Sequence, residues 1–147
     1  MMLDTGKRIL IVGLGLMGGS YARGFKKLGF TVTAITRSQS SIDYALENGI
    51  IDRGSCTPDP ALIGEADLIV FALYPHVFID WIAENQTAMK PGVLLTDVTG
   101  VKGSVVERVQ ELLRPDVEFI AAHPMAGREV YGVENSDDAI FRGANYI

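Results

Sequence analysis

Apolar residues along this chain fall into short runs that are separated by longer amphipathic stretches. Residues 9–12 and 68–73 are continuous apolar runs, which are typical of strands covered on both faces of a sheet. Residues 17–28 instead follow a helical pattern and are closed by Gly29, a residue that favours the end of a helix. The chain therefore begins with a strand, a turn and a helix.

The same alternation of strand and helix continues along the chain. Further strands are expected at 30–35, 93–96 and 118–121, with a short excursion towards the sheet at 50–52. Further helices are expected from a cap at Ser40 or Ser41 to about residue 48, and at 75–89 and 104–113, with a short helix or turn at 58–64. This alternation predicts an α/β fold with a doubly wound, mostly parallel sheet of the Rossmann type. Ligands of such a sheet lie beyond the carboxyl ends of its strands.

The first turn carries a G-x-G-x-x-G motif between the expected strand and helix. Gly13 allows a sharp turn, Gly15 lets a pyrophosphate approach the main chain, and Gly18 lets the helix lie close to the sheet. The helix N-terminus, including Leu16 and Met17, offers N–H groups and a positive dipole end to phosphates. A plain tight turn is the alternative, but the strand-to-helix context favours dinucleotide binding.

The end of the second strand indicates which dinucleotide is preferred. Proteins that bind NAD usually hold the ribose 2′-hydroxyl with an acidic residue at this place. This chain has Thr36, Arg37 and Ser38 there instead. Arg37 can grip a 2′-phosphate and stack on adenine, although a solvated loop charge would explain it too. We therefore predict NADP as the preferred cofactor and NAD as the alternative.

Two further strand ends are expected at the same edge of the sheet. Leu73 ends one strand and is expected to contact the cofactor, and Tyr74 and Pro75 after it are expected to flank the ribose. His123 follows another, where an imidazole can accept a proton from an alcohol as a hydride leaves the same carbon. A structural histidine bonded to the backbone explains that position equally well. We interpret His76 as a surface residue at the start of a helix.

Composition narrows the classes of partner. The 147 residues are 48% hydrophobic and 21% charged, which is typical of one soluble globular domain. The net charge of −5 argues against nucleic acid or a membrane surface as the partner. With no apolar run of membrane-spanning length and no cationic leader, we expect a cytoplasmic protein. We expect no metal site, since Asp137 and Asp138 lack a cluster of His or Cys.

Three segments together resemble the prephenate and arogenate dehydrogenases of tyrosine biosynthesis. They are the glycine motif, residues 97–102 (DVTGVK) and residues 123–129 (HPMAGRE), of which the last is highly specific. The resemblance covers essentially the whole chain. It implies that residues 1–147 form a dinucleotide-binding domain, truncated near its C-terminal end. Family members continue into a helical domain that dimerises and binds the substrate's carboxylates, and we expect that domain to be absent here.

The resemblance also implies a role for each matching residue. His123 corresponds to the catalytic histidine that hydrogen-bonds the ring hydroxyl of the substrate, and Glu129 to an acidic residue at the pocket mouth. Asp97 and Lys102 correspond to residues near the nicotinamide. Many members have a serine that orients the histidine where this chain has Gly100. Thr99 or a water is expected to take over that role.

The implied reaction is oxidative decarboxylation of prephenate to 4-hydroxyphenylpyruvate, or of arogenate to tyrosine, with NADP or NAD. The expected partner is this small substrate. The full-length protein is expected to be a homodimer. This chain alone is expected to turn over little or no substrate. Two other functions compete with this one. The first is an NADP-dependent oxidoreductase of small hydroxy acids or imines, which would normally use a lysine on a later helix. The second is a non-catalytic module that senses a dinucleotide, against which His123 and Glu129 argue.

Overall fold

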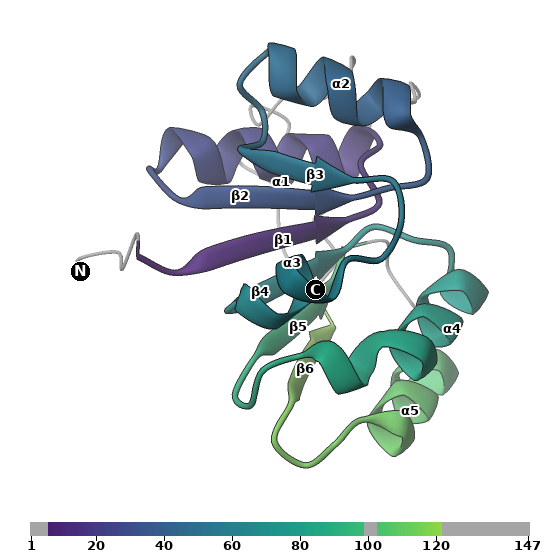
Figure 1. Ribbon diagram of the computed structural model, residues 1–147. Coiled ribbons are helices and arrows are strands. Elements are labelled where there is room, and N and C mark those ends of the chain that lie inside the picture. The colour runs from purple at the N-terminus through teal and green to yellow at the C-terminus, as the bar shows by residue number, and fades with distance from the viewer. Residues whose placement is uncertain (1–5, 99–102, 122–147) are drawn as a thin grey trace, which may run out of the picture.

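The computed structural model describes residues 6–98 and 103–121, and every structural statement below concerns these residues. Six parallel strands form one sheet in the order β3-β2-β1-β4-β5-β6 (Figure 1). The strands are β1 (Arg8–Val12), β2 (Thr31–Ile35), β3 (Arg53–Ser55), β4 (Leu68–Phe71), β5 (Leu94–Asp97) and β6 (Glu118–Ala121). This is the strand order of a doubly wound nucleotide-binding sheet, which confirms the predicted fold class.

Helices cover both faces of this sheet (Figure 1). One face packs against α1 (Leu16–Lys27) and α2 (Gln39–Glu47). The other packs against α3 (Pro60–Glu65), α4 (Pro75–Asn85) and α5 (Gly103–Leu112), with a short 3₁₀ helix η1 (Gln86–Ala88) after α4. The crossovers run in opposite directions on either side of β1, so the fold has a switch point between β1 and β4.

The central strand shows why an uninterrupted apolar run predicts a strand here. Leu10 and Val12 belong to the core cluster on one face, while Ile9 and Ile11 belong to the cluster on the other. Because successive side chains of a strand point to opposite faces, a strand covered on both sides needs apolar residues at every position. All four side chains are at most 3% exposed.

An aromatic group fills the space between the sheet and α4. The rings of Phe71 and Phe78 have centroids 4.8 Å apart, and those of Phe71 and Trp81 are 5.2 Å apart. Phe78 and Trp81 lie three residues apart on α4, so they share one face of the helix. That face fastens α4 to the end of β4, where the candidate site begins.

The structure corrects three local predictions. Ser38, and not Ser40 or Ser41, caps α2, because the Ser38 hydroxyl accepts a hydrogen bond from the Ser41 N–H at 3.3 Å. The third strand occupies Arg53–Ser55 and not 50–52, since Ile50 and Ile51 close the end of α2 and fill the core. The helix predicted at 75–89 ends at residue 85 and continues as η1.

Carboxylates fasten the elements at the amino ends of the strands. Asp52 accepts hydrogen bonds from the Val32 N–H at 2.8 Å and from Lys26 Nζ at 2.7 Å. Burial by itself raises the pKa of Asp52. The hydrogen bonds from Lys26 and Val32 and the charges of Lys26 and Arg53 outweigh that effect, so its pKa lies below the usual aspartate value. The carboxylate therefore stays charged and pins the start of β2.

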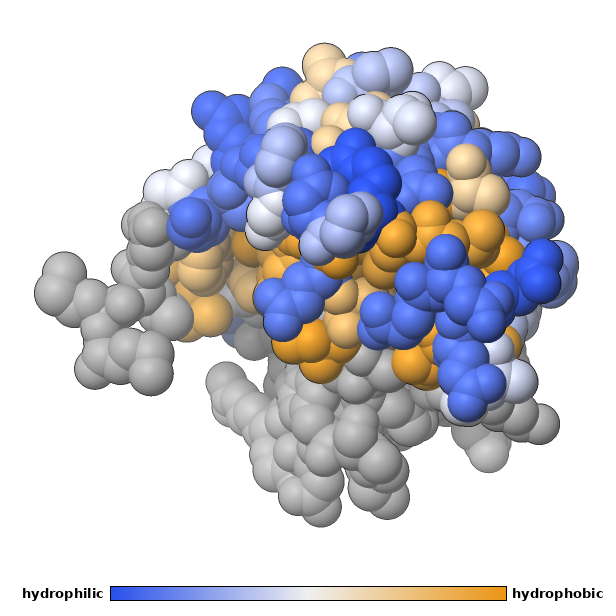
Figure 2. Space-filling view, turned by 90° about the horizontal axis from the view of Figure 1, so that it is seen from below, coloured by the Kyte–Doolittle hydropathy of each residue, from blue (hydrophilic) through white to orange (hydrophobic). Residues whose placement is uncertain are grey.

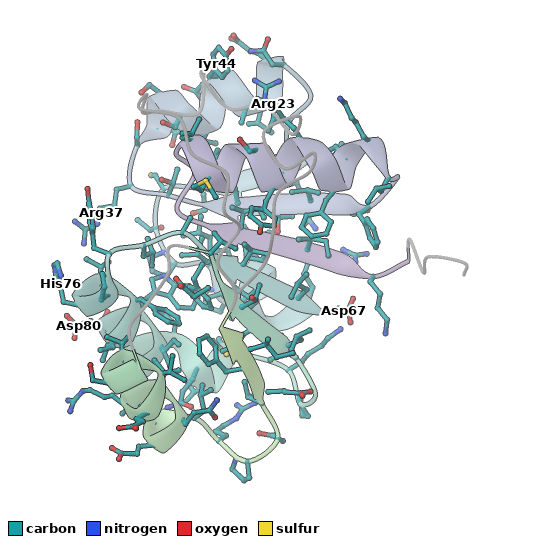
Figure 3. All side chains as sticks on the ribbon, turned by 180° about the vertical axis from the view of Figure 1, so that it is seen from behind. Arg23, Arg37, Tyr44, Asp67, His76 and Asp80 are labelled. Atoms are coloured by element: carbon teal, nitrogen blue, oxygen red, sulfur yellow. The ribbon has the colours of Figure 1, made fainter. Side chains whose placement is uncertain are left out.

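Asp67 holds the start of β1 in the same way. Its carboxylate accepts a hydrogen bond from the Arg8 N–H at 2.7 Å and forms an ion pair with Lys90. Burial by itself raises the pKa of Asp67. The hydrogen bonds from Lys90 and Arg8 and the charges of Lys90 and Lys7 have the larger, opposite effect, so its pKa lies below the usual aspartate value. Figure 3 shows Asp67 at the edge of the sheet opposite to Arg37. This edge therefore serves stability, while the carboxyl edge is left for a ligand.

β6 is the last strand of the sheet and has a neighbour on one side only. Ile120 on this strand is 50% exposed, which is unusual for a large apolar side chain of this protein. The molecule seen from below Figure 1 shows apolar side chains gathered between hydrophilic ones (Figure 2). No helix within residues 6–98 and 103–121 is long and apolar enough to cross a membrane.

Candidate functional site

The register of the sheet brings four strand ends to one edge. Val12, the last residue of β1, is aligned with Ile35 of β2 and with Phe71 of β4. Phe71 is in turn aligned with Asp97 of β5. The carboxyl ends of β1, β2, β4 and β5 therefore lie next to one another, around the switch point (Figure 1). All the cofactor contacts predicted from the described residues lie at these strand ends or just beyond them.

Packing alone requires two glycines of the motif. Gly13 has φ +95°, a conformation that favours glycine, and its N–H donates to the Ile35 carbonyl at 2.9 Å. A Cβ on Gly13 would also overlap the Ala72 carbonyl oxygen. A Cβ on Gly18 would overlap the Gly13 carbonyl oxygen, so Gly18 permits the close approach of α1 to the turn. These two positions agree with the structural roles predicted for them.

Gly15 differs from both of these glycines. It precedes α1 with a negative φ of −103°, and a Cβ there would meet no packing neighbour within 4 Å among the described residues. Neither a positive φ nor packing against these residues therefore requires a glycine at this position. A ligand that rests directly on the main chain does explain it, because a side chain would occupy the space of that ligand.

The N-terminus of α1 provides donors for such a ligand. No side chain caps this helix among the described residues, and its first turn carries no acidic residue. The N–H groups of Leu16, Met17 and Gly18 have no acceptor within the helix, since the first intrahelical bond runs from Gly19 N to Gly15 O at 2.8 Å. Three donors at the positive end of a helix dipole fit a phosphate.

The turn after β2 combines an exposed cation with hydroxyl groups. Thr36 is half-buried and donates its N–H to the Ser55 carbonyl at 3.1 Å, while Arg37 and Ser38 are exposed. In the part of the chain that the structure describes, the Arg37 guanidinium forms no ion pair. The Ser38 hydroxyl lies 2.8 Å from that of Ser40, a neighbour that we did not predict. The pairing of Ser38 with Ser40 follows from the position of Ser38 as the N-cap of α2. In the sequence, its only sign is that residues 38–41 are rich in serine.

The turn after β4 places an aromatic residue at the same edge. Leu73 packs against the core, whereas Tyr74 is 76% exposed and precedes Pro75, the first residue of α4. His76 is also exposed, as predicted. Figure 3 shows His76 and Arg37 on the same side of the molecule, where they project from neighbouring turns.

The end of β5 places an acidic residue next to the end of β4. Asp97 is fully buried at the last position of the strand, and the N–H of Val98 donates to the Phe71 carbonyl at 3.0 Å. The chain reaches the same edge again at the end of β6.

The other predicted site residues lie outside the described residues, so their roles stay predictions. They are Thr99, Lys102, His123 and Glu129. In the described ranges no group of three or more His, Cys, Asp or Glu side chains could hold a metal ion.

A family model and curated relatives show the family of this chain. The family model described as "Prephenate dehydrogenase, nucleotide-binding domain" matches residues 21–147. The glycine motif lies before the matched residues, so it is an independent observation. The prephenate dehydrogenase of Lactococcus lactis is 35% identical over 144 residues, which are 96% of this chain and 40% of the relative. The chain thus spans about two fifths of the length of this relative.

Solved structures show the same relationship in three dimensions. The arogenate dehydrogenase of Synechocystis matches 95% of this chain and 48% of its own chain, with a TM-score of 0.86 and 27% identity. A prephenate dehydrogenase from A. aeolicus, solved in complex with hydroxyphenyl propionate and NAD+, has a TM-score of 0.85 and 28% identity over 99% of this chain and 50% of its own. Imine reductases share the fold, one from Pseudomonas at 20% identity with a TM-score of 0.71.

Proposed function

This chain belongs to the family of prephenate dehydrogenase nucleotide-binding domains, and on that premise we propose that it binds NAD(P) at its glycine-rich turn for a dehydrogenase reaction. The observation that carries this proposal is Gly15, whose missing side chain leaves open space that no packing neighbour among the described residues fills. The uncapped N-terminus of α1 beside it supplies donors for the pyrophosphate. Residues 1–147 act as the dinucleotide-binding domain.

NADP is the preferred dinucleotide in this proposal. A 2′-phosphate adds negative charge to the ribose, and the turn after β2 offers the exposed guanidinium of Arg37 with no carboxylate among its neighbours Thr36 and Ser38. Arginine binds phosphate with paired donors, whereas a carboxylate at this place would repel it. Ser38 contributes less than its sequence position suggests, because its hydroxyl already caps α2.

The proposed reaction is the oxidative decarboxylation of prephenate or arogenate. When bound, the oxidised nicotinamide supplies a hydride acceptor. His123 accepts or shares the proton of the ring hydroxyl, and Thr99 orients that imidazole. Asp97 and Lys102 hold the nicotinamide end of the cleft, and Glu129 lies at the pocket mouth. The family relationship supports these roles, and the burial of Asp97 at the end of β5 agrees with a fixed position for its carboxylate.

Titration of the purified chain with NADP and NAD tests the proposal. We expect binding of both dinucleotides, with a lower Kd for NADP, measured by calorimetry or by fluorescence of the reduced forms. An Arg37→Ala variant should lose at least about tenfold more affinity for NADP than for NAD, because the guanidinium meets a charge that only NADP carries.

A matched control is Arg108→Ala, which removes an exposed arginine from α5. It should leave both Kd values within about twofold of the parent. Tighter binding of NAD than of NADP by the parent would overturn the cofactor assignment. Absence of binding to either dinucleotide would overturn the proposed function itself.

A further inference from the structure

β3 differs from the other strands of the sheet in what it offers to the core. Its three residues, Arg53, Gly54 and Ser55, include no apolar side chain, whereas each of the other five strands carries at least two. It also lies at an end of the sheet, with β2 as its single neighbour (Figure 1). Burial of apolar side chains, which fixes the other strands, therefore contributes little to the position of β3.

The two faces of β3 are held by different contacts. On one face Gly54 lies directly against α2, where a Cβ would come within 2.8 Å of the Ile42 Cδ1 atom. Arg53 points to the other face, because successive side chains of a strand alternate. Its guanidinium forms an ion pair with Glu65, the last residue of α3. This ion pair fastens the second face of β3 to a helix.

Glu65 holds a second arginine as well. One oxygen of its carboxylate binds Arg53, and the other accepts a hydrogen bond from Arg8 Nη1 at 3.0 Å. Arg8 begins β1 and Arg53 begins β3, so the carboxylate joins the strands on either side of β2. Its side chain is 24% exposed, about half as much as either arginine. Without this anion, two guanidinium groups that reach for one point would repel each other.

β3 in turn supports the turn that carries Arg37. The Ser55 carbonyl at the end of β3 accepts the N–H of Thr36 at 3.1 Å, and Thr36 directly precedes Arg37. The Ser55 hydroxyl donates to the Thr57 carbonyl at 2.7 Å and accepts the Thr57 N–H at 3.2 Å, which shapes the turn after β3. A displacement of β3 would therefore move the start of the Arg37 turn.

We propose that Glu65 is a positioning residue for the choice between NADP and NAD. Through Arg53 it fixes β3, and β3 fixes the backbone of Thr36, from which the Arg37 guanidinium reaches the 2′-phosphate. The paired donors of a guanidinium bind phosphate only in a defined geometry, so a small displacement weakens this contact. The inference rests on the proposed function and deepens it, because it assigns cofactor discrimination to a residue that does not touch the dinucleotide.

Glu65→Gln in the purified chain tests this role, because it keeps the size of the side chain and removes its charge. The Kd for NADP should rise by about three- to fivefold while the Kd for NAD stays unchanged, so the preference for NADP falls by the same factor. Loss of a negative charge by itself would act in the opposite direction, since NADP is the more negatively charged dinucleotide. A fall in preference therefore reports the position of the turn.

Further variants match this one. Arg53→Gln breaks the same ion pair with the opposite change in net charge and should lower the preference for NADP equally, whereas Arg53→Lys should keep most of it. Asp43→Asn is the control, since it removes a negative charge from α2, where Asp43 accepts a hydrogen bond from Gln39 at 2.9 Å. It should not lower the preference. In an Arg37→Ala background, Glu65→Gln should change the ratio of the two Kd values no further.

The outcomes separate the two proposals. Thermal unfolding first establishes that each variant is folded at the temperature of titration. An unchanged preference in Glu65→Gln, or an equal loss of affinity for both dinucleotides, would overturn the role of Glu65 and leave dinucleotide binding intact. An undiminished fall in the Arg37→Ala background would also overturn it, because the effect would not pass through Arg37. Failure of the parent to bind either dinucleotide would overturn the proposed function itself.

Discussion

The glycines of the first turn satisfy two different physical requirements. Gly13 and Gly18 are needed for the turn itself, since a Cβ on either would overlap a carbonyl oxygen. Gly15 has a negative φ and faces open space among the described residues. The same motif therefore contains two glycines that the fold needs and one that is proposed to serve a ligand. Substitution can separate these requirements at single positions.

A Gly15→Ala variant should fold normally and bind poorly. The cost in stability should be about 1 kcal/mol or less, because alanine is a poorer N-cap residue than glycine while the new methyl meets no packing neighbour among the described residues. The methyl occupies the space predicted for the pyrophosphate, so the Kd for NADP should rise by at least about tenfold. Thermal unfolding and nucleotide titration measure the two effects.

Gly18→Ala is the matched control for this substitution. Its methyl would overlap the Gly13 carbonyl oxygen, so α1 must shift and the Tm should fall clearly below that of the parent. Should Gly15→Ala bind NADP as tightly as the parent, the phosphates do not rest on this turn.

Residue positions at the candidate site were largely predictable because their signals are local. The glycine motif, the missing carboxylate after β2 and the turn after β4 each depend on a few consecutive residues. The commitment of the Ser38 hydroxyl to the cap of α2 was not predicted, because Ser38, Ser40 and Ser41 are equally suited to cap a helix.

At the scale of elements, charged pairs at the amino edge hold strands to the helices and turns around them. Asp67 lies just before β4. Its carboxylate accepts a hydrogen bond from the N–H of Arg8, the first residue of β1, and forms an ion pair with Lys90, which precedes β5. Its side chain is 20% exposed, so these contacts are partly shielded from water. A charge that is hydrogen-bonded in the folded state and hydrated in the unfolded state makes stability depend on pH.

Asp67→Asn should lower the free energy of unfolding near neutral pH by roughly 1–2 kcal/mol. The pKa of Asp67 is depressed in the folded state, so its contribution is complete above the unfolded value of about 3.9 and is lost as pH falls through the folded value. The difference between variant and parent should therefore shrink below about pH 4. Urea unfolding at several pH values measures it.

The control is Asp116→Asn, which breaks an exposed pair with Arg114 at 3.0 Å. Its effect should stay below about 0.5 kcal/mol at every pH. An equal effect of the two substitutions at neutral pH would contradict the role of Asp67 at the sheet edge.

The end of α4 shows why the limits of an element escape a local pattern. The apolar spacing predicts a helix to residue 89, but the helix ends at Asn85. The Arg114 guanidinium donates to the Gln86 carbonyl at 3.1 Å and to the Met89 carbonyl at 2.9 Å. A residue 28 positions later thus binds carbonyls of the final turns. The residues near Gln86 in the sequence do not indicate that Arg114 will bind there. By contrast, β6 has the predicted bounds, since its apolar residues and flanking turns are local.

At the scale of the whole molecule, the described residues form a nucleotide-binding sheet with its open edge around the switch point. The relatives that share this sheet are longer, and the chain spans 40% of the Lactococcus lactis relative. Dinucleotide binding can therefore be tested on this chain, whereas turnover belongs to the whole protein. The proposed catalytic group, His123, lies beyond the described residues.

His123→Ala in the whole protein should separate chemistry from binding. Loss of a positioned proton acceptor should lower kcat with prephenate or arogenate by about 10²–10⁴-fold. The Kd for NADP should remain within about twofold, because His123 is proposed to contact the substrate and not the phosphates. Steady-state kinetics and titration provide the two values. A variant that keeps full turnover would assign the proton transfer to another residue and favour the structural interpretation of the histidine.

The sequence by itself determined the class of fold, the alternation of strands and helices, and the family, because apolar periodicity and short motifs are properties of neighbouring residues. Tertiary structure decided which glycines of the motif are required by packing and which one is not, where α4 ends, and that Arg37 and Tyr74 follow the strands on either side of β1. Each of these depends on atoms from distant parts of the chain. Strand register brings such atoms together, because it aligns residues that lie far apart in the sequence.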